Sequence, residues 1–90
     1  MFDALVREYA GTERDLLVEV KAGCDRATCR LAAGQLQDYR RLLPRRAATD
    51  LAVLFPDRPS KHAFELFGDL GIRVAWFSVD RKKVVGEVRL

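Results

Sequence analysis

The chain has 90 residues, of which 49% are hydrophobic and 32% charged, a composition that indicates one folded domain over residues 1–90 and excludes a disordered chain. Its apolar runs are far shorter than the roughly 18 residues that a membrane span needs, and no apolar signal core is present, so we expect a cytoplasmic protein with no membrane contact. The formal charge of +3 mildly favours an anionic partner such as nucleic acid.

The first 21 residues predict a β-hairpin. Residues 2–8 alternate loosely between apolar and polar side chains, and residues 16–21 are rich in the β-branched and apolar residues typical of strands. Gly11 and Thr12 lie between the two segments, where a turn is expected. Gly23 ends the second strand.

A long helix is expected next, over residues 26–43. Asp25 or Thr28 can cap its start, and Pro44 stops it. Its expected inner face consists of residues spaced four apart, which are Leu31, Gln35, Tyr39 and Leu43.

The second half predicts a strand over residues 50–55, a helix that begins at Ser60, a strand over 72–79 and an edge strand over 84–90. Gly71 lies where a helix ends in the left-handed conformation. The order β-β-α-β-α-β-β predicts an α/β fold with a mixed central sheet of about five strands flanked by two helices.

The segment Glu19-Val20-Lys21 carries the main candidate for chemistry. Strand residues two apart point to the same side, so Glu19 and Lys21 project together from an otherwise apolar strand. A salt bridge at a solvated sheet edge explains such a pair in ordinary terms. The alternative is a metal site, in which the carboxylate binds Mg²⁺ or Mn²⁺ and the ammonium group orients a water or neutralises a phosphate.

A metal site of this kind needs a second carboxylate. Asp3 and Glu19 each lie eight residues from Gly11, so a hairpin that turns there brings the two carboxylates opposite each other. Asp15 is the rival, but it lies four residues before Glu19, roughly 13 Å along the strand. We therefore expect Asp3 and Glu19 to bind one cation together.

Two further groups of residues are candidates for binding. Gln35 and Tyr39 lie one helical turn apart on the expected inner face, where a glutamine is either a hydrogen-bonded core residue or part of the site. Basic side chains that either contact a DNA backbone or form ordinary solvated charge are Arg40, Arg41, Arg45, Arg46, Lys82 and Lys83.

Taken in order, Asp3, Glu19-Val20-Lys21 and Gln35-x-x-x-Tyr39 resemble the PD-(D/E)XK nuclease superfamily, in its RecB-like branch with a Q-x-x-x-Y motif. The resemblance implies a restriction-endonuclease-like core in which Asp3 and Glu19 bind Mg²⁺ and Lys21 assists the attacking water. It places the residues at positions 35 and 39 beside the site. Family members usually begin with a helix that this chain lacks, so we expect a C-terminal fragment, a reduced member or a domain completed by a partner.

Three functions follow from these patterns. The first is a metal-dependent deoxyribonuclease, and the second is a non-catalytic nuclease-like module that binds DNA or a protein. The third is a structural module with a surface ion pair. With only two helices for the sheet, we also expect an uncovered apolar patch involving Leu5, Val18 or Val20, through which the chain forms a homodimer or docks onto another chain.

Overall fold

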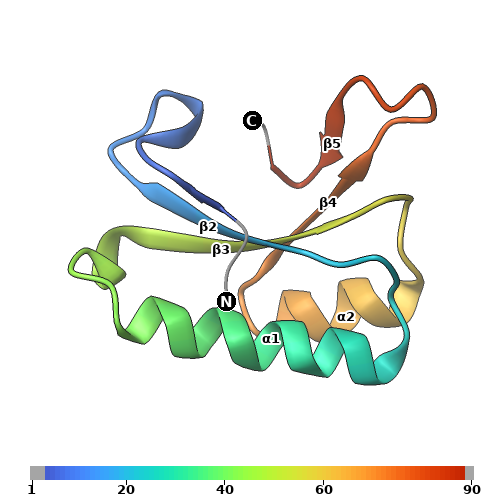
Figure 1. Cartoon of the computed structure of the whole chain (residues 1–90), viewed down its shortest axis with the longest axis horizontal. Coiled ribbons are helices and arrows are strands. Elements are labelled where there is room, and N and C mark those ends of the chain that lie inside the picture. The colour runs from blue at the N-terminus through green and yellow to red at the C-terminus, as the bar shows by residue number, and fades with distance from the viewer. Residues whose placement is uncertain (1–3, 89–90) are drawn as a thin grey trace.

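Five strands form one mixed sheet, and two helices pack on one of its faces (Figure 1). The structure is a computed structural model that describes residues 4–88. The strands are β1 (Ala4–Val6), β2 (Asp15–Val20), β3 (Thr49–Phe55), β4 (Arg73–Phe77) and β5 (Val84–Gly86). The helices are α1 (Arg26–Arg41) and α2 (Lys61–Asp69), and two short 3₁₀ turns are η1 (Tyr9–Gly11) and η2 (Arg46–Ala48).

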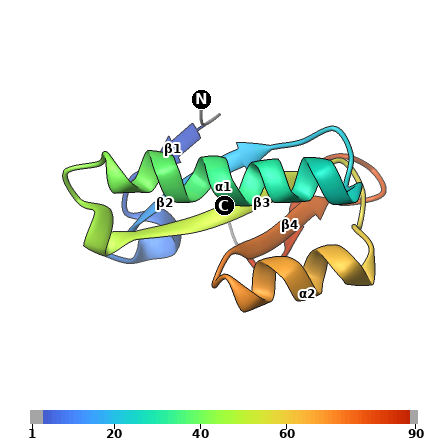
Figure 2. The same cartoon turned by 90° about the horizontal axis from the view of Figure 1, so that it is seen from below.

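The strands lie in the sheet in the order of the sequence, β1-β2-β3-β4-β5. The outer pairs β1–β2 and β4–β5 are antiparallel, whereas β3 is parallel to both of its neighbours. The predicted element order and mixed sheet are therefore confirmed. The expectation that the helices flank the sheet needs correction: α1 crosses β2 and β3, and α2 lies beside it along β4 on the same face (Figure 2).

The topology explains why both helices share one face. The crossovers β2–α1–β3 and β3–α2–β4 step in the same direction along the sheet. Parallel crossovers are almost always right-handed, so two steps in one direction place both helices on the same side. The helix-side core contains buried residues of both helices and of the three inner strands, among them Leu17, Leu36, Val53, Phe67 and Val74.

The hairpin turns where its symmetry predicts. The paired positions of β1 and β2 are Ala4↔Val18, Leu5↔Leu17 and Val6↔Leu16, and each pair is centred on position 11. The connection spans residues 7–14 and contains η1, and Glu8, Ala10 and Gly11 adopt positive φ angles of 49°, 52° and 73° there. A one-residue shift of this register would turn every β1 side chain to the other face of the sheet.

Helix α1 begins where the sequence predicts, and Asp25 caps it by accepting a hydrogen bond from the Thr28 backbone N–H at 2.9 Å. Its buried face differs from the predicted one. The fully buried positions include Ala32 and Ala33, whose small side chains let the helix approach the sheet closely, whereas Leu31 is 57% exposed. The predicted stripe therefore lies along the edge of the contact, with Gln35 and Tyr39 half-buried.

The face of the sheet opposite the helices is also covered. The hairpins β1–β2 and β4–β5 rise on the side away from the helices (Figure 1), and a second core of side chains fills the space between them. Its buried members are Tyr9, Leu16, Val18, Ala52, Leu54, Ala75 and Val88.

This second core corrects the expectation of an apolar patch. Val18 is buried and Leu5 packs partly buried against the helix side, so only Val20, at 45%, is an exposed member of the expected set. Self-association stays a prediction. Within the described residues, neither helix is long and apolar enough to cross a bilayer.

Candidate active site

Glu19 and Lys21 lie at the carboxyl end of β2, on the side of the sheet that carries α1. Glu19 shares its face with Leu17, which belongs to the helix-side core, and the whole Glu19 residue is 3% exposed. The Lys21 backbone N–H donates to the carbonyl of Leu54 at 3.0 Å, which extends the β2–β3 ladder by one bond. The two charged side chains therefore project together, as the strand period predicts.

A chain of polar contacts joins this pair to α1. The Lys21 ammonium Nζ lies 3.2 Å from Glu19 Oε1 and donates a hydrogen bond to Gln35 Oε1 at 3.0 Å. The side chains of Glu19 and Lys21 are only 4% and 17% exposed, so little water screens their charges. The structure thus brings three of the predicted site residues, Glu19, Lys21 and Gln35, into one connected group.

The second carboxylate oxygen of Glu19 has a different environment. Glu19 Oε2 is buried, and no hydrogen-bond partner for it exists among the described residues. Leaving a buried acceptor unsatisfied costs about 1–3 kcal/mol, and more when it is charged. Such an oxygen, beside an ammonium group, fits the ligand set of a divalent cation, which requires negatively charged or neutral oxygen atoms.

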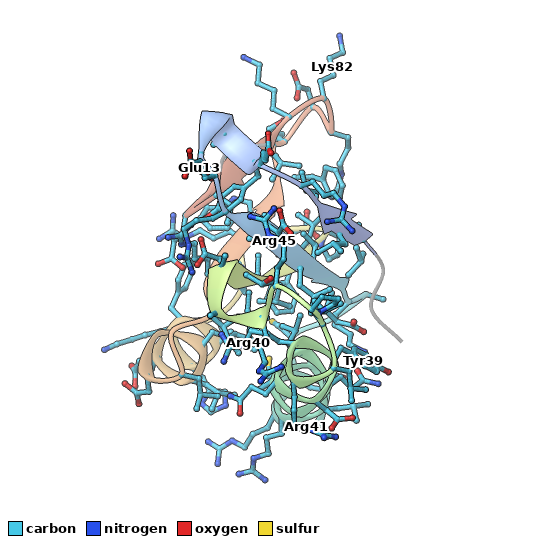
Figure 3. The ribbon with its side chains drawn as sticks, turned by 90° about the vertical axis from the view of Figure 1, so that its left-hand side faces the viewer. Glu13, Tyr39, Arg40, Arg41, Arg45 and Lys82 are labelled. Atoms are coloured by element: carbon cyan, nitrogen blue, oxygen red, sulfur yellow. The ribbon has the colours of Figure 1, made fainter. Side chains whose placement is uncertain are left out.

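Tyr39 lies one helical turn beyond Gln35 and packs, half-buried, against the helix-side core. Figure 3 shows it on one side of α1, with Arg40 projecting toward the α2 side. The predicted glutamine and tyrosine therefore both face the body of the protein, Gln35 through its contact with Lys21 and Tyr39 through packing.

Asp3 and Asp15 are the two candidates for a second carboxylate beside Glu19. Asp3 lies outside the described residues. Asp15 is 1% exposed, but its oxygens are already engaged: Oδ1 accepts from the Glu8 backbone N–H at 3.2 Å, and Oδ2 lies 3.7 Å from both Arg7 and Arg45. Asp15 therefore anchors the start of β2. Residues 4–88 contain no group of three or more His, Cys, Asp or Glu side chains placed to hold a metal.

The predicted basic residues separate into three places (Figure 3). Arg40, Arg41 and Arg46 line one hollow at the end of α1. Arg45 points elsewhere, because its guanidinium group contacts Asp15 and donates to the Glu13 carbonyl at 2.7 Å. Lys82 and its neighbour Lys83 lie on the turn between β4 and β5, distant from the end of α1 in Figures 1 and 3.

Sequence reasoning missed a second polar group, centred on Asp50 near the start of β3. The Tyr9 hydroxyl donates to Asp50 Oδ2, and Arg73 donates to the Tyr9 hydroxyl oxygen. Arg14 donates to Asp50 Oδ1 at 3.0 Å. The sequence signal was a carboxylate at the start of an otherwise buried strand, and its partners come from two distant segments, the β1–β2 connection and β4.

The environment of Asp50 determines its titration. Burial alone would raise the pKa of Asp50, but hydrogen bonds from Arg14 and Tyr9, and the charges of Arg14 and Arg73, outweigh it and lower that pKa. Burial, together with the hydrogen bond and the charge of Asp50, raises the pKa of Tyr9. A lowered carboxylate pKa stabilises the fold above the unfolded value near 3.9, and this contribution is lost as the pH falls through the folded value.

We expect Asp50→Asn to lower the free energy of unfolding at pH 7 by roughly 1–3 kcal/mol, because the substitution weakens charge-assisted bonds to two arginines. The difference from the parent protein should shrink as the pH falls below about 4. Urea unfolding between pH 7 and pH 3 measures both effects. A difference that stays constant down to pH 3 would show that the Asp50 charge contributes nothing.

The Glu19 group thus brings together a carboxylate with one unsatisfied oxygen, an ammonium group and a side-chain amide. Comparisons of this chain with protein-family models, with curated proteins and with solved structures found no match.

Proposed function

We propose that this protein is a metal-dependent nuclease with a restriction-endonuclease-like core, and that it cleaves phosphodiester bonds of DNA. In this proposal Glu19 and Asp3 hold Mg²⁺ or Mn²⁺, which supplies a Lewis acid beside the scissile phosphate. Lys21 orients a water or neutralises phosphate charge, and Gln35 positions Lys21. Tyr39 packs beside the group.

The observation that carries the proposal is the unsatisfied oxygen of Glu19 beside Lys21. A structural ion pair at this depth would normally use both carboxylate oxygens, because an unpaired one destabilises the fold. An unsatisfied buried oxygen is expected where a ligand completes the group. The Lys21–Gln35 hydrogen bond supports the same reading, since it holds the ammonium group in place without engaging that oxygen.

The described part of the hairpin supports Asp3 as the second carboxylate. The paired residue numbers of β1 and β2 sum to 22, and directly opposed residues of an antiparallel pair share one face. Positions 3 and 19 have the same sum, which is the sequence spacing on which the expectation for Asp3 rests. Asp15, the rival, is already occupied by its own hydrogen bond and ion pairs.

The direct test is cleavage of supercoiled plasmid by the whole chain in Mg²⁺, in Mn²⁺ and in EDTA. We expect nicked and linear DNA only with the metal ions, and none from a Lys21→Ala variant purified by the same steps. Activity that persists in EDTA, or that is equal in Lys21→Ala, would contradict the proposal because it would not depend on this group.

The second candidate is a non-catalytic module that binds DNA or a protein on the same scaffold. The basic hollow at the end of α1 favours it, since that hollow does not depend on Glu19 or on a metal. DNA binding without cleavage under all metal conditions would select this alternative. A plain structural role for the Glu19–Lys21 pair is the third possibility, and the stability measurement in the Discussion separates it from the first.

A further inference from the structure

A hollow with a volume of about 820 Å³ lies between the end of α1, the η2 turn and the start of β3. Its charged lining comes from separate segments: Arg14 precedes β2, Arg40 and Arg41 end α1, and Arg46 begins η2. Its lining residues include none of Glu19, Lys21 and Gln35, so the hollow is distinct from the Glu19 group.

The charges of the hollow are not balanced within it. Four arginines face two aspartates, and each aspartate already has an arginine partner: Asp38 with Arg41 at 2.7 Å and Asp50 with Arg14 at 2.9 Å. In the described part of the chain, Arg40 and Arg46 have no ion-pair or hydrogen-bond partner for their side chains. Two guanidinium groups are therefore available to a ligand.

The form of the hollow favours a chain of phosphates over a small apolar molecule. Sites for drug-sized ligands of similar volume are lined mainly by apolar and aromatic side chains. Here no aromatic residue is present, and the lining consists chiefly of arginine, aspartate, glutamine and threonine. Arginine forks match phosphate oxygens, and phosphate and sugar contacts account for half or more of protein–DNA hydrogen bonds.

We propose that this hollow binds the phosphate backbone of a nucleic acid through Arg40 and Arg46, with Arg14 and Arg41 held beside them by Asp50 and Asp38. The bound phosphates belong to the backbone of the nucleic acid, and their recognition depends neither on the nucleotide sequence nor on a metal ion. Arg45, Lys82 and Lys83 lie outside the site. The inference deepens the proposed function by locating its DNA contact, but binding here requires neither Glu19 nor cleavage.

The test measures fluorescence anisotropy of a labelled 20-base-pair duplex with the whole chain in EDTA, from 50 to 300 mM NaCl. The double variant Arg40→Gln/Arg46→Gln should bind about 10- to 100-fold more weakly at 100 mM salt, and its log–log salt slope should be smaller by about two. Arg46→Glu, on an exposed position, serves as a second variant if the half-buried Arg40 proves necessary for folding.

The matched control is Lys82→Gln/Lys83→Gln, which also removes two positive charges, but from the β4–β5 turn. Its affinity should fall by less than about threefold, since contact at the hollow dominates. Equal losses in both double variants, or none in either, would overturn the proposal. So would binding of an acidic polyglutamate peptide as tight as that of the duplex, because the hollow would then recognise any polyanion.

Binding measured in EDTA and cleavage measured in Mg²⁺ keep this inference separate from the proposed nuclease activity, because the first requires no metal. Tight, arginine-dependent binding without cleavage in Mg²⁺ would support DNA binding at the hollow and contradict the proposed nuclease activity. Metal-dependent cleavage, with DNA binding unaffected by the substitutions of Arg40 and Arg46, would support the nuclease activity and contradict DNA binding at the hollow.

Discussion

Glu19→Gln is expected to lower the rate of Mg²⁺-dependent DNA cleavage by about 10²-fold or more. The substitution retains the size of the side chain but removes its negative charge, which makes a carboxylate a stronger ligand of a divalent cation than a neutral amide. Lys21 would keep its hydrogen bond to Gln35, so the remaining geometry of the group should persist. Initial rates of cleavage of a fluorescent duplex at saturating Mg²⁺ provide the measurement.

The chain supplies a matched control for this experiment. Lys61 and Glu65 form an ion pair on α2 at 3.8 Å, with side chains 91% and 64% exposed. Glu65→Gln makes the same chemical change on the surface and should leave the cleavage rate unchanged. If Glu19→Gln and Glu65→Gln cleave equally fast, Glu19 does not take part in catalysis.

The stability of Glu19→Gln, measured with and without metal, separates a ligand-binding role from a structural one. Removal of one partner from a buried structural ion pair costs about 3–5 kcal/mol. Glu19 Oε1 pairs with the buried Lys21 ammonium, so both roles predict a loss of this size in the metal-free protein, and the response to added metal is the measurement that separates them. Added Mn²⁺ should raise the melting temperature of the parent and not that of the variant.

Gly86→Ala is expected to lower the free energy of unfolding by about 3 kcal/mol. Gly86 has a φ of +109°, which side-chain-bearing residues rarely adopt. A Cβ atom there would lie 2.6 Å from Cζ3 of Trp76 and 2.8 Å from the backbone oxygen of Val74. The backbone oxygen cannot move aside without disturbing β4, so the edge strand itself would have to shift.

Gly34→Ala is the control for that substitution. Gly34 lies within α1, and a Cβ atom there would have no neighbour within 4 Å outside the backbone of its own helix. The change should raise stability by about 0.5–1 kcal/mol, because alanine is the better helix former. Urea unfolding followed by the fluorescence of the single tryptophan measures both variants, and a Gly86→Ala protein as stable as the parent would contradict the predicted clash.

The candidate site shows where prediction from sequence ended. The period of a strand was enough to place Glu19 and Lys21 on one side, and the spacing of a helix was enough to group Gln35 with Tyr39. Neither spacing says how far a helix is rotated on the sheet. Ala32 and Ala33 are buried in the rotation that the structure shows, and that rotation brings Gln35 to Lys21 at the edge of the core.

The basic residues and Asp50 illustrate the same limit over longer distances. Arg45 and Arg46 are adjacent in the sequence, yet Arg45 turns to Asp15 and Arg46 faces the hollow. Asp50 contacts Tyr9 and Arg14 of the β1–β2 connection and Arg73 of β4, and only the folded sheet brings these segments together. Composition alone could count these charges but could not assign their partners.

The amino-acid sequence by itself determined the order of the elements, the centre of the hairpin at Gly11, the cap at Ser60 and the shared side of Glu19 and Lys21. Each of these depends on backbone geometry within a few residues or on one symmetric turn. Only the tertiary structure decided that both helices share a face and that the two hairpins close over the other, because handed crossovers and sheet curl act between segments far apart in the chain.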